Sequence, residues 1–265
     1  MKFNNKNVFV SPKARIGENV RIGDNTVIYE GVEIGDHSVI CNDCLIGEPL
    51  NAYYHDDAYQ QPITRIGAHS LIRSHCILYA GSTFGDHFAT GHRVTIREYV
   101  TAGRYFSVGT LSDLQGYARF GHYCRLHSNV HIGQQSNVGH FVFIYPYVVF
   151  TNDPHPPSNI CQGPSVGDYT QIGVHTVLLP MVKIGSQCLI GANSTVSRDF
   201  GDEVLIAGSP AKVICPIGAV KSKEHPDTFH YPWMYHFERG MPWEGMGYDQ
   251  WKESGAEALI SGRQG

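Results

Sequence analysis

Residues 16–45 read IGENVR-IGDNTV-IYEGVE-IGDHSV-ICNDCL when the chain is cut into blocks of six. Each block opens on isoleucine, and its fifth residue is Val, Thr, Ser or Cys. The same pattern runs on in register through seven hexads that begin at Val10 to Ile46, fifteen at Ile66 to Phe150 and six at Val166 to Val196. A repeat that occupies most of a chain determines its fold, because every block must form the same local structure.

The hexad is a short strand followed by a corner. Its first residue is usually aliphatic, its second is most often Gly, and its fifth is small or β-branched. Residues two apart in a strand share a face, so the fifth residue and the first residue of the next hexad both point inward, while Gly and Asn or Asp relieve the corner. The pattern therefore predicts an all-β coil with flat sides. Four cysteines occupy the inward fifth position and are expected to fill the core: Cys44, Cys76, Cys124 and Cys188.

The repeat [LIV]-Gly-x-x-[small]-x resembles that of the hexapeptide-repeat acyltransferases, and the resemblance covers residues 8–214. It implies a left-handed parallel β-helix with three hexads per turn, although parallel crossovers are generally right-handed. The hexads then predict about nine coils, or about 45 Å of prism at the usual strand spacing. We expect a β-helix acyltransferase domain over residues 1–214 and a short aromatic and helical C-terminal extension over residues 215–265.

Composition limits the possible partners and location. The chain has 265 residues, with 20 Lys and Arg against 24 Asp and Glu. Without a run of basic residues, neither nucleic acid nor an anionic membrane is expected as a partner. The first residues lack an apolar signal-peptide core, and nowhere do eighteen apolar residues follow one another. We therefore expect a cytoplasmic protein.

Three segments depart from the repeat. Residues 48–65 and 151–165 interrupt the register, and loops on a rigid scaffold are where binding sites are usually built. The last fifty residues hold all three tryptophans, Trp233, Trp243 and Trp251. We expect this extension either to cap the open end of the coil or to pack on a neighbouring subunit.

Residues eighteen apart should stack in columns. Asn152 and Asp153 open the second loop directly above Gln134 in the coil below. The corner column that holds them is Ala80, Glu98, Gly116, Gln134 and Asn152. A second polar column, on another corner, is Asp86, Arg104, His122 and His140.

The residue at position 134 bears on the kind of acceptor. Hexapeptide acyltransferases that acylate hydroxyls place a histidine base in a His-Ile-x-His-Asp sequence, and the corresponding stretch here is His131-Ile-Gly-Gln134-Gln135. Glutamine cannot accept a proton at neutral pH, whereas an uncharged amine needs mainly to be oriented. This favours an amine acceptor without a general base. The other candidates for a base are His127, His131, His140 and His155.

The segment 148–157, VVFTNDPHPP, resembles the corner loop of the dTDP-3-amino-3,6-dideoxyhexose N-acetyltransferases. That resemblance implies a homotrimer with sites between subunits, acetyl-CoA as acyl donor, and a nucleotide-linked amino sugar of the kind built into lipopolysaccharide O-antigen. Asn152 would hold the sugar amino group or the thioester carbonyl, and Gln134 a sugar hydroxyl. No metal is expected.

Further site residues follow from the same resemblance. The ending AGSPAK at 207–212 resembles the family's coenzyme A end, where Lys212 would meet the adenosine phosphates and backbone groups near Gly173 and Ala192 would follow the pantetheine arm. The expected sugar-binding residues are His131, Asp153, His155 and Tyr145.

Two alternatives stay open at this point. Gamma-class carbonic anhydrases share the fold, the trimer and the Gly-x-Pro-Ala-Lys ending, and their ligand pattern would place zinc on His122 and His127. A third histidine would be expected at position 86, where this chain has Asp86. A non-catalytic β-helical scaffold is the other alternative. Stabilisation by acetyl-CoA or by zinc separates these readings.

Overall fold

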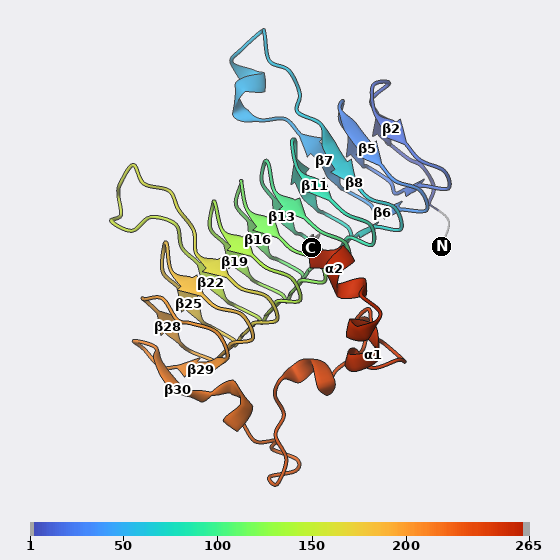
Figure 1. Ribbon diagram of the computed structural model, residues 1–265. Coiled ribbons are helices and arrows are strands. Elements are labelled where there is room, and N and C mark those ends of the chain that lie inside the picture. The colour runs from blue at the N-terminus through green and yellow to red at the C-terminus, as the bar shows by residue number, and fades with distance from the viewer. Residues whose placement is uncertain (1–2, 262–265) are drawn as a thin grey trace.

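The computed structural model describes residues 3–261 and shows a three-sided parallel solenoid with two long loops and a C-terminal segment along its side (Figure 1). Each of the predicted hexads forms one strand that ends at, or one or two residues after, the first residue of the hexad. Strands eighteen residues apart pair in parallel, as Thr95 does with Asp113 and Asp113 with His131. The spacing of three hexads thus determines which residues pair in the sheets.

Three sheets form the faces of the prism, here called faces A, B and C. Face A has ten strands: β1 (Phe9–Val10), β4 (Val27–Ile28), β7 (Leu45–Glu48), β10 (Ile77–Tyr79), β13 (Thr95–Ile96), β16 (Asp113–Leu114), β19 (His131–Ile132), β22 (Val149–Phe150), β25 (Val177–Leu178) and β28 (Thr195–Val196). Face B has nine: β2 (Arg15–Ile16), β5 (Val32–Ile34), β8 (Thr64–Ile66), β11 (Thr83–Phe84), β14 (Thr101–Ala102), β17 (Arg119–Phe120), β20 (Asn137–Val138), β23 (Ser165–Val166) and β26 (Lys183–Ile184).

Face C has eleven strands: β3 (Arg21–Ile22), β6 (Val39–Ile40), β9 (Leu71–Ile72), β12 (Ala89–Thr90), β15 (Ser107–Val108), β18 (Arg125–Leu126), β21 (Phe143–Ile144), β24 (Gln171–Ile172), β27 (Leu189–Ile190), β29 (Val204–Ala207) and β30 (Lys212–Pro216). The last two lie beyond the predicted hexads, and β30 folds back antiparallel to β29. The corners where the chain passes between faces are called the A–B, B–C and C–A corners.

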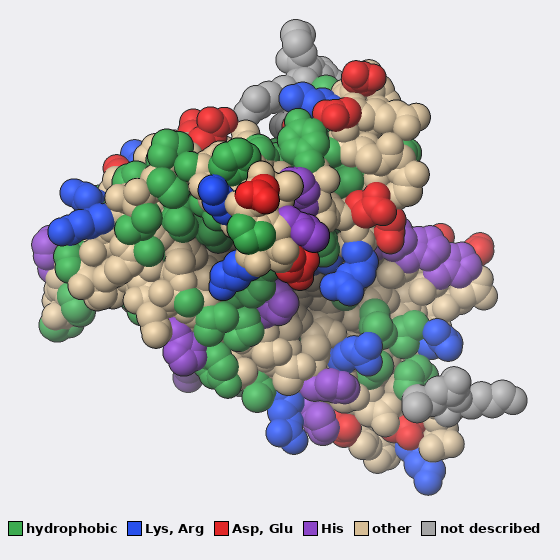
Figure 2. Space-filling view, turned by 90° about the horizontal axis from the view of Figure 1, so that it is seen from below, with side chains coloured by type: hydrophobic (Ala, Val, Ile, Leu, Met, Phe, Trp, Pro, Cys, Tyr) green, Lys and Arg blue, Asp and Glu red, His purple; other side chains and the backbone are tan. Residues whose placement is uncertain are grey.

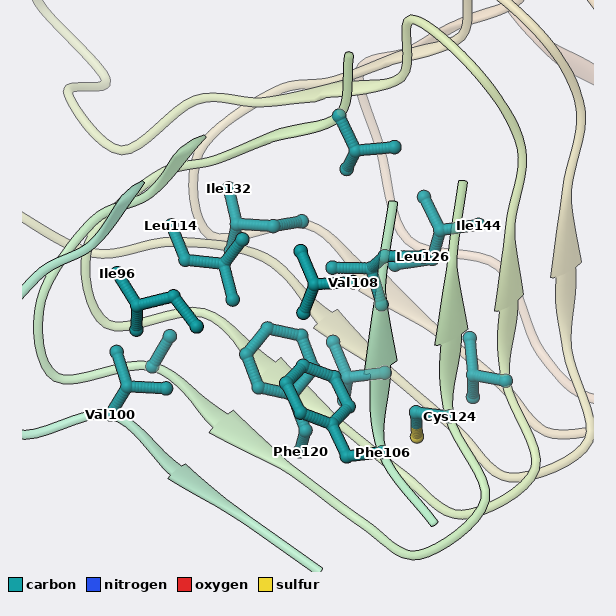
Figure 3. Close-up of a cluster of buried hydrophobic side chains, with 14 of the residues drawn as sticks. Ile96, Val100, Phe106, Val108, Leu114, Phe120, Cys124, Leu126, Ile132 and Ile144 are labelled. Carbon is teal, nitrogen blue, oxygen red and sulfur yellow. The ribbon is translucent and has the colours of Figure 1, made fainter. Parts of the chain in front are cut away.

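The interior follows the predicted alternation. First- and fifth-position side chains fill the prism, among them Ile96, Val100 and Leu114, which are fully buried (Figure 3). Phe106 and Phe120 stack with ring centroids 4.7 Å apart. The four fifth-position cysteines are buried and free, which confirms their expected place in the core.

The fourth residue of most hexads has a positive φ although it is not glycine, for example 58° at His37 and 57° at Tyr105. This conformation costs energy for an L-residue, but it lets the backbone N–H bond to the coil below, as Tyr105 does to the carbonyl of Asp86. At the B–C corner these residues form a continuous stack of rings: His37, His69, His87, Tyr105, Tyr123, Phe141 and Tyr169.

The C-terminal segment continues the ring stack into a second core. It contains the 3-10 helices η2 (Ile217–Ala219) and η3 (Trp233–Tyr235) and the helices α1 (Tyr248–Glu253) and α2 (Ala256–Ser261), while η1 (Asn51–Tyr54) lies in the first loop. Trp233 donates its indole N–H to the carbonyl of Tyr169, and Trp243 packs on Phe141. The segment therefore packs on the side of its own solenoid, and the expectation that it caps the open end was wrong. The stacked rings offer an apolar surface along that side of the solenoid.

Candidate active site at the A–B corner

Both long loops leave the solenoid at the A–B corner. The first joins β7 to β8 and the second joins β22 to β23, and both project on the same side of the coil (Figure 1). Their limits agree with the predicted interruptions to within two residues. Five coils separate them, about 24 Å at the usual strand spacing. The Gln134 and Asn152 column lies on this corner, next to the second loop.

A loop cysteine joins the two predicted amide side chains. The Asn152 amide Nδ2 donates to Cys161 Sγ at 3.2 Å, and the Cys161 thiol donates to Gln134 Oε1 at 3.1 Å. All three side chains are half-buried. The Asn152 carbonyl also accepts the N–H of Gln162 at 2.8 Å, so the loop returns directly over its own start. The structure thus brings Gln134 and Asn152 together. Sequence reasoning missed Cys161, because an irregular loop gives no register from which to place it.

Asp153 and His155 lie in the first turn of the second loop. The Asp153 carboxylate accepts the Ser158 hydroxyl at 2.6 Å and the backbone N–H groups of Ser158 and His155 at 2.8 and 3.0 Å. These bonds, led by the Ser158 hydroxyl, hold the pKa of the Asp153 carboxyl below its usual value. His155 is exposed. The Asp153 carboxylate therefore stabilises the turn with which the second loop begins, and His155 is part of that turn.

His131 lies on face A in β19, the strand that leads directly into the turn of Gln134, and is paired with an acid. Its Nδ1 is 3.1 Å from Asp113 Oδ2, and Gln115 donates to the same carboxylate at 2.6 Å. The bond to His131 is the main reason that the pKa of Asp113 is lowered. Asp113 fixes the orientation of the imidazole. The eighteen-residue register would have placed Asp113 beside His131, but the sequence reasoning did not use that signal.

The remaining predicted residues lie on face C and the C–A corner. Tyr145 stacks on His127 with centroids 4.8 Å apart. Gly173 lies beneath Ala192, since a Cβ at Gly173 would come within 2.7 Å of the Ala192 nitrogen. Lys212 begins β30 and is exposed. Within one chain, face A separates this corner from the Asn152 corner, so Tyr145 does not join the other predicted sugar contacts.

The histidines of the carbonic anhydrase alternative lie apart. His122 is at the B–C corner, where its Nδ1 accepts the N–H of Arg104 at 2.9 Å, while His127 is at the C–A corner. Asp86 accepts the N–H of Ala68 at 2.9 Å. Within residues 3–261 no group of three or more His, Cys, Asp or Glu is placed to hold a metal ion. The geometry of this chain thus gives the zinc hypothesis no support.

Comparisons with known proteins agree with the repeat. The family model "Bacterial transferase hexapeptide (six repeats)" matches residues 13–48, and "Hexapeptide repeat of succinyl-transferase" matches residues 181–208. The solved UDP-N-acetylglucosamine acyltransferase of Arabidopsis superposes with a TM-score of 0.66 at 16% identity, over 82% of this chain and 74% of that one. The left-handed parallel β-helix that the family resemblance implied is therefore confirmed.

Two curated relatives carry transferase names. The acyl-[acyl-carrier-protein]–UDP-N-acetylglucosamine O-acyltransferase of Thiobacillus denitrificans is 29% identical over 116 residues, which are 44% of this chain and 39% of that protein. The galactoside O-acetyltransferase of Escherichia coli is 30% identical over 109 residues, 33% of this chain and 54% of its own length. The matches thus span about two fifths to one half of these relatives. Over the described residues, every helix is too short or too polar to cross a membrane.

Proposed function

We propose that this chain, which belongs to the hexapeptide-repeat transferase family, is an acyltransferase that moves an acetyl group from acetyl-CoA to the amino group of a nucleotide-linked hexose. A dTDP-3-amino-3,6-dideoxyhexose is the acceptor that the loop sequence favours. The names of the relatives support acyl transfer, and one of them names a nucleotide sugar.

One observation carries the amine acceptor: the two side chains that meet beneath the second loop are amides. Gln134 and Asn152 share the Cys161 thiol, and neither amide can take a proton at neutral pH. Amides orient a nucleophile and stabilise an oxyanion, which is what an uncharged amine requires. A hydroxyl acceptor would need a base at this place.

The reaction then proceeds by direct attack. The uncharged amine nitrogen forms a bond to the thioester carbonyl carbon while the Asn152 Nδ2–H group, turned from Cys161, donates to the developing oxyanion. The tetrahedral intermediate collapses, the C–S bond breaks and coenzyme A leaves as thiolate. The amine proton passes to that thiolate or to water, so no side chain must accept it.

The other predicted residues bind the substrates. In this proposal Gln134 holds a sugar hydroxyl, and the second loop brings Asp153 and His155 to the sugar. His131, oriented by Asp113, contacts it from face A. Backbone groups at Gly173 and Ala192 follow the pantetheine arm, and Lys212 meets the phosphates.

A second copy of the chain completes the site. Because face A separates the Asn152 corner from the corner of Tyr145 and Gly173, the donor and acceptor halves meet only when the A–B corner of one protomer faces the C–A corner of its partner. We therefore propose a homotrimer with three sites. Sedimentation that shows an active monomer would refute this assembly.

Release of coenzyme A tests the activity. Acetyl-CoA is offered with nucleotide-linked amino sugars and with the matching sugars that carry a hydroxyl at the same carbon. Turnover of the amino sugars alone supports the proposal, whereas preference for the hydroxyl sugars contradicts it. Stabilisation by zinc together with CO2 hydration would replace it with the carbonic anhydrase alternative, and a protein that binds neither ligand would be a scaffold.

A further inference from the structure

A cavity of about 700 Å³ lies between face C and the C-terminal segment. Its floor is a place where two successive coils carry small outward residues, Ala89 and Ser107 on the face and Gly91 and Gly109 at the C–A corner. The C-terminal segment passes over it and supplies the roof. Figure 2 shows the molecule from below, with basic, acidic, histidine and hydrophobic side chains interspersed on that side. The cavity exists because the outward side chains of face C are small where the C-terminal segment crosses it.

The floor is fixed by the packing of the coils. A Cβ at Gly109 would run into backbone atoms of His127 and Ser128, and one at Gly91 into those of Thr110. Neither position can carry a side chain without moving the next coil. The depth of the cavity is therefore a property of the solenoid itself and does not depend on the rotamer of any floor side chain.

Positively charged side chains lie at the two ends of the cavity. Arg73 lies at one end of it, three coils below the end that holds Arg125 and Arg239, and the residues that line it include no Asp or Glu. Over residues 3–261, no carboxylate forms an ion pair with Arg73 or Arg239, and both are exposed. Burial and the neighbouring Arg239 lower the pKa of Arg125. An anion placed beside Arg125 and Arg239 would offset the repulsion between these two guanidinium groups.

Arg125 has a separate structural task. Its guanidinium donates to the carbonyls of Arg239 and Gly240 at 2.8 and 2.9 Å and lies over the Phe143 and Phe237 rings. It thereby holds the roof in place. Arg73 and Arg239 are thus the two arginines of the lining that are available to a ligand.

Flat apolar surfaces complete the lining. The stacked pair of His127 and Tyr145 forms one rim, and Tyr231, Trp233 and Phe237 project from the roof. Aromatic walls with a few fixed polar groups, in a volume of several hundred Å³, are typical of pockets for small organic ligands. A planar base would lie against the rings while its phosphates reach the arginines.

We propose that this cavity binds the nucleoside diphosphate portion of a ligand, with the phosphates on Arg73 and Arg239 and the base against the aromatic rings. The inference rests on the proposed function, both of whose substrates carry such a group: the nucleotide sugar and coenzyme A. The new element is a nucleotide site that the C-terminal segment forms together with face C of the same protomer.

Titration of the full-length protein with dTDP and, separately, with coenzyme A tests the proposal, with binding followed by calorimetry and by tryptophan fluorescence. The variants are Arg73→Gln and Arg239→Gln, together with Ala89→Phe, which fills the floor without removing charge. Matched controls are Arg119→Gln and Thr101→Phe on face B, far from the cavity. Circular dichroism and melting temperature show that each variant is folded.

We expect the three cavity variants to weaken binding of one of the two probes at least tenfold and the controls to leave it unchanged. Loss of dTDP binding assigns the cavity to the nucleotide sugar. Loss of coenzyme A binding assigns it to the acyl donor and replaces Lys212 as the proposed site of the adenosine phosphates. Unchanged binding of both probes in folded variants overturns the proposal. Nucleotide binding at the cavity without coenzyme A release on any amino sugar would leave the cavity site standing and remove the proposed function.

Discussion

The B–C and A–B corners are built from the same hexad but are bonded differently. At the B–C corner the His122 and His140 imidazoles accept backbone N–H groups through Nδ1, and the fourth-position rings stack without a break from His37 to Tyr169. At the A–B corner two loops interrupt the stacking, and the amides of Gln134 and Asn152 are bonded to a loop thiol. Where the polar side chains of a corner bond to the backbone of the solenoid, their role is structural. Where a loop interrupts the corner, the polar side chains bond to that loop and can turn from it to a ligand.

The largest effect should come from Asn152→Ala. If its amide donates to the oxyanion, the rate constant for acetyl transfer should fall about a hundredfold or more. Single-turnover measurement of coenzyme A release isolates this step, and circular dichroism checks folding. The control is Asn51→Ala, an exposed residue of η1 in the first loop at the same corner. Equal, small losses in both variants would show that Asn152 is only a corner residue.

Replacement of His131 tests whether the A–B corner acts without a base. His131→Asn should lower kcat less than about tenfold, because orientation of the sugar is then its only role, while a general base supplies about a hundredfold or more. The measurement is kcat as a function of pH. Loss of several thousandfold, with loss of the acidic limb of the profile, would mean that the His131 and Asp113 pair is the base.

Gln134→Ala should have an effect of similar size to that of His131→Asn, but carried by KM and not by kcat. One neutral hydrogen bond contributes about 0.5–1.5 kcal/mol, so the ratio kcat/KM should fall about two- to twelvefold, mainly through KM for the sugar. Steady-state kinetics with acetyl-CoA held at saturation gives this number. Gln187→Ala, at a corner position far along the solenoid, is the control. A larger fall carried by kcat alone would assign Gln134 to the transition state.

The smallest effect concerns stability at the B–C corner. Burial, with help from His140 and Arg104, holds the pKa of His122 below its usual value. The unfolded chain therefore binds this proton more readily than the folded chain does, so the stability contributed by His122 is full above the ordinary histidine pKa of about 6.5 and is lost as the pH falls below it.

His122→Asn should remove that pH dependence. Asparagine keeps the acceptor, as Asn42 accepts the N–H of Asp24 at the same hexad position, but it does not titrate. Melting temperatures of the two proteins should agree at pH 8, and the variant should lose less on acidification to pH 5.5. Identical losses would show that His122 titrates alike in the folded and unfolded chains. Activity should not change.

The sequence by itself determined the solenoid. The spacing of Ile16, Ile22 and Ile28, with inward Thr26 and Val32, gives strand positions, register and core, since each coil must lie on the one before it. The same arithmetic places Gln134 beneath Asn152 and would have placed Asp113 beside His131. Both results follow from the six-residue pattern and the eighteen-residue length of a coil, so they require no knowledge of contacts between irregular segments.

The tertiary structure alone decided what the irregular segments do. Cys161 reaches Gln134 only because the second loop folds back on itself, and Arg125 meets the carbonyls of residues more than a hundred positions away. The aromatic residues of the C-terminal segment showed that it must be buried, but composition does not specify against which surface. The outward-facing ring of Phe143 and the end of the ring stack at Tyr169 supplied that surface, and the small residues beside them left a cavity beneath it.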